Sequence, residues 1–225
     1  MKYIISILIA GLFFSSCTSN RTGEKVTNSE TQAVVVKNAT STKKVSELSK
    51  AYFASGCFWC VEAIFESVEG VGEAVSGYAG GTKENPTYQE VGGGLTNHTE
   101  AVEVYYDPEV VSYATLLKVY YGSHNPTTVN GQRPDFGKQY RSMILYTNEM
   151  EKEAAQNFKK ELEAGGTYSE PIATEIEPLT KFWIAEEYHQ DYEKRNPNNS
   201  YVQNVSVPRL NRFKAKFPEL LKKGH

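Results

Sequence analysis

The pattern of apolar and polar positions divides this chain into three parts. Residues 3–14 form a short apolar run behind Lys2, and residues 18–48 are mostly Thr, Ser, Asn, Lys and Glu. From residue 49 onward, short apolar stretches with strand or helix spacing follow one another. Because the polar middle part cannot bury enough apolar area to offset chain entropy, the packed core has to come from residues 49–225.

Within residues 49–225 the pattern predicts alternating strands and helices. The expected strands are 51–54, 73–79, 100–106, 142–146 and 172–176, and the expected helices are 57–68, 112–121, 149–164, 182–194 and 208–222. Several connections between strands are too short for parallel crossovers. We therefore expect a single α+β domain, a ferredoxin-like sandwich in which helices pack around a mixed sheet.

The N-terminal apolar run has the features of an export signal. Residues 3–14 are too few to cross a bilayer as a helix, which needs about 20 residues. Ser15, Ser16 and Cys17 follow, as in the cleavage box of bacterial lipoproteins, whose cysteine becomes the lipidated first residue. We expect residues 1–17 to be a lipoprotein-type signal peptide with Cys17 as the lipidation site, and residues 18–48 to be a flexible tether. An ordinary secretory signal with an incidental cysteine is the alternative.

On this interpretation the protein is exported and anchored to the membrane through an N-terminal lipid, facing the periplasm or the cell exterior. Composition argues against several kinds of partner and site. The net charge of -3 provides no basic surface for nucleic acid, so no nucleic-acid partner is expected. Three cysteines are too few for a disulfide framework, and the four histidines lack the helical spacing of a zinc site, so we expect no metal. Nothing in the sequence calls for an obligate partner, and a monomer is expected.

Two of the cysteines, Cys57 and Cys60, lie where a predicted strand leads into a predicted helix. A thiol at a helix N-terminus faces unpaired N–H groups and the positive end of the helix dipole, which favour the reactive thiolate. Cys60 lies one turn later on the same face, within reach for a disulfide. The pair is therefore a candidate redox couple with Cys57 as nucleophile. Buried core cysteines, half of a metal site and a thioredoxin-type Cys-x-x-Cys motif are the alternatives.

The residues around the pair resemble the active-site signature of the A-type peptide methionine sulfoxide reductases, which contains Gly-Cys-Phe-Trp. The resemblance continues in the family's order from about residue 51 to residue 200. The further matching segments are SGYAGG at 76–81, NPTY at 85–88, HTEAV at 98–102, PTTVN at 126–130, DFG at 135–137, QYRS at 139–142 and YHQDY at 188–192. An ordered set of this length is far more specific than a single Cys-x-x-Cys motif.

The resemblance implies an enzyme that reduces the S epimer of methionine sulfoxide in proteins, peptides and possibly the free amino acid, and so repairs oxidative damage. It assigns nucleophilic attack to Cys57 and proton donation to Glu100, whose pKa must then be raised by burial. Tyr88 and Tyr140 would direct phenolic O–H groups at the sulfoxide oxygen. The resemblance also implies that Phe58 and Trp59 form the methyl pocket and that Asp135 helps to hold the substrate. Taken singly, Glu100 could be a surface carboxylate, and the aromatic residues could belong to the core.

Reduction would leave a sulfenic acid on Cys57, which a second thiol must resolve. Some relatives use a cysteine in the C-terminal tail, but residues 196–225 contain none, and Cys17 lies at the far end of the tether. By elimination, Cys60 is the expected resolving residue. No bound cofactor is expected, and an external thioredoxin-like reductant or dithiol would reopen the disulfide.

Three positions depart from the family's usual pattern: Asn97, Thr99 and Asn125. All lie beside the implied site, so they bear on substrate preference. Two other functions remain open from the sequence, a thiol–disulfide oxidoreductase acting on protein disulfides and a lipoprotein binding module without enzymatic activity.

Overall fold

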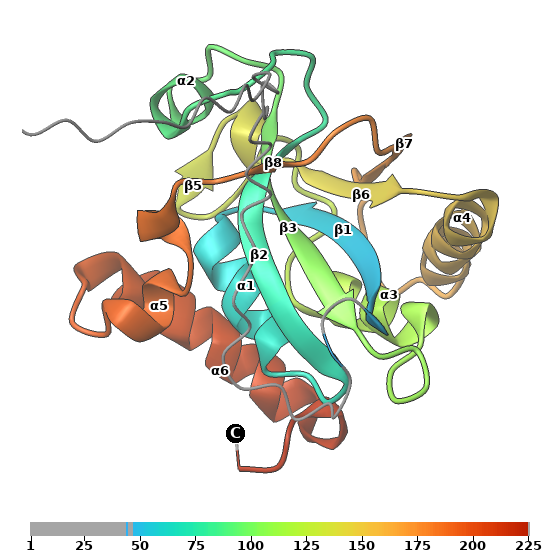
Figure 1. Cartoon of the computed structure of the whole chain (residues 1–225). Helices are drawn as coiled ribbons and strands as arrows, with labels where there is room; N and C mark the ends of the chain where they lie inside the picture. Colours follow the sequence, from blue (N-terminus) through green and yellow to red (C-terminus); the bar gives the residue numbers. More distant parts are fainter. Residues whose placement is uncertain (1–43, 45–46, 225) are drawn as a thin grey trace, which may run out of the picture. The chain divides into compact units, whose positions relative to one another are not determined.

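A computed structural model describes residue 44 and residues 47–224 (Figure 1). The predicted signal peptide at 1–17, with Cys17, and nearly all of the predicted tether at 18–48 lie outside the described residues. Within the described part of the chain, no helix is long and apolar enough to cross a membrane.

One mixed sheet forms the centre of the domain, with the strand order β7-β6-β1-β3-β2-β8 (Figure 1). Its strands are β1 (Ser49–Ser55), β2 (Val71–Ala79), β3 (Thr99–Tyr106), β6 (Ser142–Tyr146), β7 (Glu175–Pro178) and β8 (Trp183–Ile184). Neighbouring strands are antiparallel, except that β6 and β7 are parallel. Two further short strands, β4 (Gly131–Gln132) and β5 (Asp135–Phe136), pair as a separate hairpin.

Most helices lie between strands in the sequence, and the last two follow β8. The helices are α1 (Phe58–Glu66), α2 (Tyr88–Gly92), α3 (Tyr113–Gly122), α4 (Glu149–Ala164), α5 (Tyr192–Arg195) and α6 (Val207–Lys216). A π-helical turn, Val202–Ser206, leads into α6, and 3-10 turns cover Lys138–Tyr140, Glu187–His189 and Pro218–Leu220. The order β1-α1-β2-β3-α3-β6, with β6, β1, β3 and β2 adjacent in the sheet, is the predicted ferredoxin-like arrangement.

The core is built by the alternation of β1. Ala51 and Phe53 belong to the large apolar cluster that includes α1 and α3, whereas Tyr52 and Ala54 belong to a smaller cluster on the other side. Phe53 is fully buried between the rings of Phe65 and Tyr120, with centroid distances of 5.0 and 5.3 Å. Side chains of a strand alternate between the two faces of the sheet, so the buried residues of β1 fix its orientation. The orientation of β1 in turn positions the residues that follow its C-terminal end.

Local capping explains several helix boundaries. Ser112 accepts a hydrogen bond from the N–H of Thr115 at the start of α3, as its position in the sequence predicts. Helix α4 ends at Gly165, also as predicted. Helix α2, which was not predicted, begins with a capping box in which Thr87 and Glu90 bond each other's backbone N–H groups.

The sequence prediction was wrong for residues 182–194, which were expected to form one helix. The segment instead contains β8, a 3-10 turn and the start of the four-residue helix α5. The expected helix 208–222 ends earlier, at Lys216, and the strand expected at 172–176 forms at Glu175–Pro178. Each of these segments is fixed by partners distant in the chain, such as Gly77 and Tyr78 for β8.

The outer edge of β2 is only partly covered by a strand, because β8 contributes two residues. Next to them, the side chain of Gln190 accepts from the N–H of Ser76 and donates to its carbonyl oxygen. The N–H of Ala185 donates to the same carbonyl oxygen. Side-chain and loop groups therefore satisfy the backbone of β2 where a long neighbouring strand is lacking.

Candidate active site

The two cysteines lie where central strand β1 turns into helix α1. Gly56 has a φ of +89°, and a Cβ there would lie 3.0 Å from the side chain of Gln132, so the turn favours glycine. Cys57 is the N-cap residue of α1, and Cys60 follows in its first turn. Both are buried free thiols. The predicted position of Cys57 at a helix N-terminus is therefore confirmed.

The two thiols share a hydrogen bond, and their surroundings shift their pKa values in opposite directions. Burial raises the pKa of Cys57, and its hydrogen bond to Cys60 raises it further. The hydrogen bond from Cys57 lowers the pKa of Cys60 to about 6, and the positive charge of Arg209 acts in the same direction. Cys60 is thus the more acidic thiol of the pair. The helix N-terminus alone had favoured a thiolate at Cys57, but burial outweighs it.

Glu100 on β3 lies beneath the first turn of α1. Its carboxyl group is buried and accepts a hydrogen bond of 3.0 Å from the N–H of Phe58, the residue after Cys57. Burial raises the pKa of Glu100 to about 8, although that hydrogen bond opposes the shift. The carboxyl group is therefore mostly protonated at neutral pH and has a proton to donate beside the cysteine pair.

The two tyrosines expected at the site, Tyr88 and Tyr140, come from α2 and from the 3-10 turn before β6. Burial and the charges of Glu100 and Cys57 raise the pKa of Tyr88 to about 12. Burial, Glu100 and Tyr88 raise the pKa of Tyr140 as well. Both phenols therefore keep their protons at neutral pH and lie close enough to Glu100 to feel its charge.

Phe58 and Trp59 form an aromatic wall beside the pair. Phe58 is buried and packs against Tyr88 and His189, with centroid distances of 6.5 and 4.9 Å. The indole N–H of Trp59 donates to Nδ1 of His189 over 3.1 Å, and its ring stacks on Tyr192 at 3.7 Å. The orientation of both rings is thus fixed by neighbours, as an apolar pocket of defined shape requires.

Asp135 belongs to the hairpin strand β5 and accepts a hydrogen bond from the hydroxyl of Tyr201. Burial raises the pKa of Asp135. Tyr201 also lies close enough to Cys57 to feel its charge and stands edge-on to Trp59, with a centroid distance of 5.8 Å. Tyr201 was not among the residues predicted from the sequence, because neither its spacing nor its neighbours in the chain distinguish it from other half-buried tyrosines.

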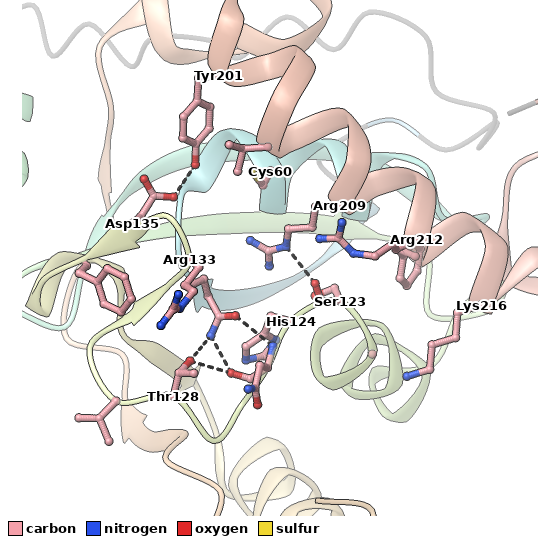
Figure 2. A pocket seen from close by; sticks show the side chains of 17 residues that line it. Cys60, Ser123, His124, Thr128, Arg133, Asp135, Tyr201, Arg209, Arg212 and Lys216 are labelled. Carbon is pink, nitrogen blue, oxygen red and sulfur yellow. Dashed lines mark hydrogen bonds between the residues drawn. The ribbon is translucent and has the colours of Figure 1, made fainter.

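A cavity of about 720 Å³ adjoins the site on the side of Cys60 (Figure 2). Asp135 and Tyr201 border it together with Cys60 and the buried guanidinium group of Arg209. Arg209, which comes from the distant helix α6, was also not predicted from the sequence.

The described residues include one group of acidic side chains close enough to hold a metal ion, formed by Glu62, Glu66 and Asp191. Lys194 forms ion pairs with Glu66 and Asp191, and Glu62 accepts hydrogen bonds from the hydroxyl of Ser76 and the N–H of Asp191. Contacts within the protein therefore already engage all three side chains, which link α1 to α5.

Comparison with known proteins identifies the family. The family model described as peptide methionine sulfoxide reductase matches residues 49–221. The chain belongs to this family. A relative, the peptide methionine sulfoxide reductase MsrA 1 of Rhodopirellula baltica, is 49% identical over 172 residues, covering 76% of this chain and 88% of the relative. The MsrA protein of Pasteurella multocida is 47% identical, covering 77% and 98%.

Solved structures of such reductases share the fold. The reduced form of Mxr1 from Saccharomyces cerevisiae matches with a TM-score of 0.65 and 32% identity, covering 73% of this chain and 94% of that one. Methionine sulfoxide reductase A of Corynebacterium diphtheriae matches with a TM-score of 0.61 and 36% identity, covering 68% and 77%. The chain is thus an A-type peptide methionine sulfoxide reductase, with the single mixed-sheet catalytic domain expected from the sequence.

Of the three unusual residues of this reductase, Thr99 and Asn125 form side-chain hydrogen bonds near the site, and Asn97 contributes only its backbone carbonyl. The hydroxyl of Thr99 donates to the carbonyl oxygen of Gln139, and the carbonyl oxygen of Asn97 accepts from Arg141. The side chain of Asn125 accepts from the N–H of Thr127. They stabilise the segments around Tyr140 and the hairpin.

Proposed function

We propose that the reductase acts on the S epimer of methionine sulfoxide in proteins and peptides, and also on the free amino acid, with Cys57 as nucleophile. The observation that carries this proposal is the buried, protonated carboxyl group of Glu100 beside the residue that begins α1. A sulfoxide sulfur accepts a thiolate readily only when its oxygen gains a proton, and Glu100 supplies one at neutral pH.

The hydrogen-bonded pair provides the attacking thiolate. As Cys57 approaches the sulfoxide sulfur, its proton passes to the thiolate of Cys60, while Glu100 protonates the oxygen. Tyr88 and Tyr140 donate hydrogen bonds to that oxygen, Phe58 and Trp59 surround the methyl group, and Asp135 helps to hold the substrate. The S–O bond breaks, methionine leaves, and Cys57 carries the hydroxyl group as a sulfenic acid. The substrate sulfur gains the two electrons that Cys57 loses.

Cys60 then resolves the sulfenic acid. Its sulfur attacks that of Cys57, and the hydroxyl group leaves as water with the proton of Cys60, which forms a disulfide. The two residues lie in one helical turn and share a hydrogen bond in the reduced state, so only a small movement is needed. A thioredoxin-like protein or another dithiol then reduces this disulfide, and the cycle needs no bound cofactor.

The cellular setting follows from the N-terminal pattern. We infer that Cys17 carries a lipid, that residues 18–48 tether a monomeric domain to the membrane, and that the reductase repairs exported proteins on the periplasmic or outer face. Metabolic labelling with a fatty acid tests this inference: the parent should incorporate label, and a Cys17→Ser variant should not. Equal labelling of both would refute it.

A stoichiometric experiment tests the chemistry. Reduced protein is mixed with an excess of a chromophore-labelled S-sulfoxide substrate, without reductant, and methionine and free thiols are counted. The parent should form about one methionine for about two thiols lost. Cys57→Ser should form none, and Cys60→Ser should form about one equivalent before stopping as a sulfenic acid.

The same experiment, together with an insulin-reduction assay, separates the rival functions. Turnover by Cys57→Ser would show that the nucleophile is misassigned. Rapid reduction of insulin disulfides with no reduction of sulfoxide would favour a thiol–disulfide oxidoreductase. A binding module would form neither methionine nor a Cys57–Cys60 disulfide.

A further inference from the structure

The cavity beside Cys60 adjoins the proposed sulfoxide site and shares Asp135 with it, but it is bordered by Cys60 and not by Cys57. It is enclosed by the β4–β5 hairpin, the loop after α3 and helix α6, and Cys60 borders it (Figure 2). Cys57, Glu100 and Phe58 are not among its lining residues. Once the Cys57–Cys60 disulfide of the proposed function has formed, the sulfur reached from this cavity is therefore that of Cys60.

The lining of this Cys60 cavity is strongly basic. Four cations border it: Arg133 from the hairpin and Arg209, Arg212 and Lys216 from α6. In the described part of the chain, none of the four forms an ion pair with a carboxylate. The lining contains one acidic residue, Asp135, whose carboxyl group accepts from Tyr201 and has a pKa raised by burial.

Arg209 is the unusual member of this set, because it is only 8% exposed. Its Nε donates to the carbonyl oxygen of Ser123 over 2.9 Å, and a terminal nitrogen donates to the hydroxyl of Ser55 over 3.2 Å. Both acceptors are neutral. The neighbouring His124 has its pKa lowered to about 3 by burial and by Arg209, so it adds no charge. A buried cation is costly unless an anion compensates it, and here the thiolate of Cys60 is the anion that feels its charge.

We propose that the Cys60 cavity binds a small thiol that carries a carboxylate, and presents its thiolate to the sulfur of Cys60. The proposal rests on the proposed catalytic cycle. It adds the chemical class of the reductant and the side from which the reductant reaches the disulfide. The cavity volume lies in the range of small-molecule sites, which span about 300–1,000 Å³. The cations would attract both the carboxylate and the attacking thiolate.

The step is a thiol–disulfide exchange. The donor thiolate forms a bond to the sulfur of Cys60, the Cys57–Cys60 bond breaks, and Cys57 leaves as a thiolate that takes a proton from water. A second donor thiolate then attacks the donor sulfur of the mixed disulfide, which yields a donor disulfide and the thiolate of Cys60 next to Arg209. Two donor thiols lose the two electrons that the protein disulfide gains.

The test starts from full-length protein whose disulfide is formed with diamide, so it does not require methionine sulfoxide. Its reduction is timed with 3-mercaptopropionate, 2-mercaptoethanol and cysteamine, which differ in charge, and rates are compared per concentration of thiolate. At low salt we expect the carboxylate thiol to react about tenfold faster than the neutral one and the cationic thiol to be slowest, with differences that shrink at 1 M salt. Equal rates for the three thiols would overturn the proposal.

A matched pair of variants tests whether the preference for the carboxylate thiol arises in the Cys60 cavity. Arg212→Gln should lower the advantage of 3-mercaptopropionate by about threefold, whereas Lys214→Gln should leave it unchanged. Both residues lie on α6, Arg212 exposed and Lys214 half-buried, and only Arg212 borders the cavity. Equal losses in both variants would contradict the proposal.

Peptide mapping of the trapped mixed disulfide gives a second readout. The adduct is expected on Cys60, and an adduct on Cys57 would overturn the proposed entry side. If the diamide-formed disulfide shows the charge preference but methionine sulfoxide never generates that disulfide, the cavity proposal stands and the proposed function fails.

Discussion

Replacing Glu100 by glutamine tests whether burial keeps this carboxyl group protonated. In the unfolded chain the group titrates near 4.5, and in the folded protein burial raises its pKa to about 8. Between these two values the folded state holds a proton that the unfolded state has lost. The free energy of unfolding therefore falls as the pH rises from about 4.5 to about 8 and is level above that range.

The size of the effect follows from the same two values. At about 1.4 kcal/mol per pH unit, the rise from 4.5 to about 8 corresponds to about 5 kcal/mol. Glu100→Gln preserves the shape and an oxygen to accept from the N–H of Phe58, but it does not titrate. Relative to the parent, the variant should therefore gain stability with rising pH, by up to about 5 kcal/mol between pH 4.5 and pH 9.

The assay measures the free energy of unfolding in urea for parent and variant at several pH values. The quantity compared across pH is the difference between the two free energies. This difference removes the contribution of other buried carboxyl groups such as Glu62, whose pKa burial also raises. Glu161→Gln, on the exposed face of α4, is the control and should show no such trend. The variant should also form methionine about 100-fold more slowly in a single turnover, because it has no proton to donate. A stability difference that stays constant from pH 5 to pH 9 would refute the reasoning.

Three further substitutions test the site and its scaffold. Tyr140→Phe should slow single-turnover methionine formation at least about tenfold, since it removes a donor to the sulfoxide oxygen, while Tyr146→Phe at the end of β6 should match the parent. Phe53→Ala should lower the free energy of unfolding by about 3–5 kcal/mol in urea, and a loss below 1 kcal/mol would contradict the central position of this ring. Gly77→Ala should destabilise by about 1–3 kcal/mol, because its Cβ would lie 2.3 Å from the ring of Phe182, and an unchanged melting temperature would show that β8 moves aside freely.

The parts of the fold that local pattern determines could be predicted from the sequence. The strand around Phe53, the helix that begins near Ser112 and the position of Cys57 before a helix depend on neighbours within a few residues, and the structure has all three. The prediction of a helix over residues 182–194 was wrong because β8 and Gln190 bind the edge of β2, more than 100 residues earlier in the chain. Tertiary pairing there overrides a local helical spacing.

The residues of the candidate site could also be predicted only in part. The family resemblance supplied Glu100, Tyr88 and Tyr140, which the structure brings near the cysteines. The distribution of charge within the thiol pair was not predictable, since it depends on burial and on Arg209. Arg209 and Tyr201 reach the site only because α6 and the turn before it pack against α1.

The incomplete outer edge of β2 has a consequence for an enzyme whose substrates are damaged polypeptides. Partly unfolded chains readily add to an open sheet edge, and such pairing leads to aggregation. Here the two-residue strand β8 and the amide of Gln190 occupy backbone groups that a foreign strand would otherwise use. At this edge of the sheet, a misfolded chain therefore finds few free backbone groups with which to pair.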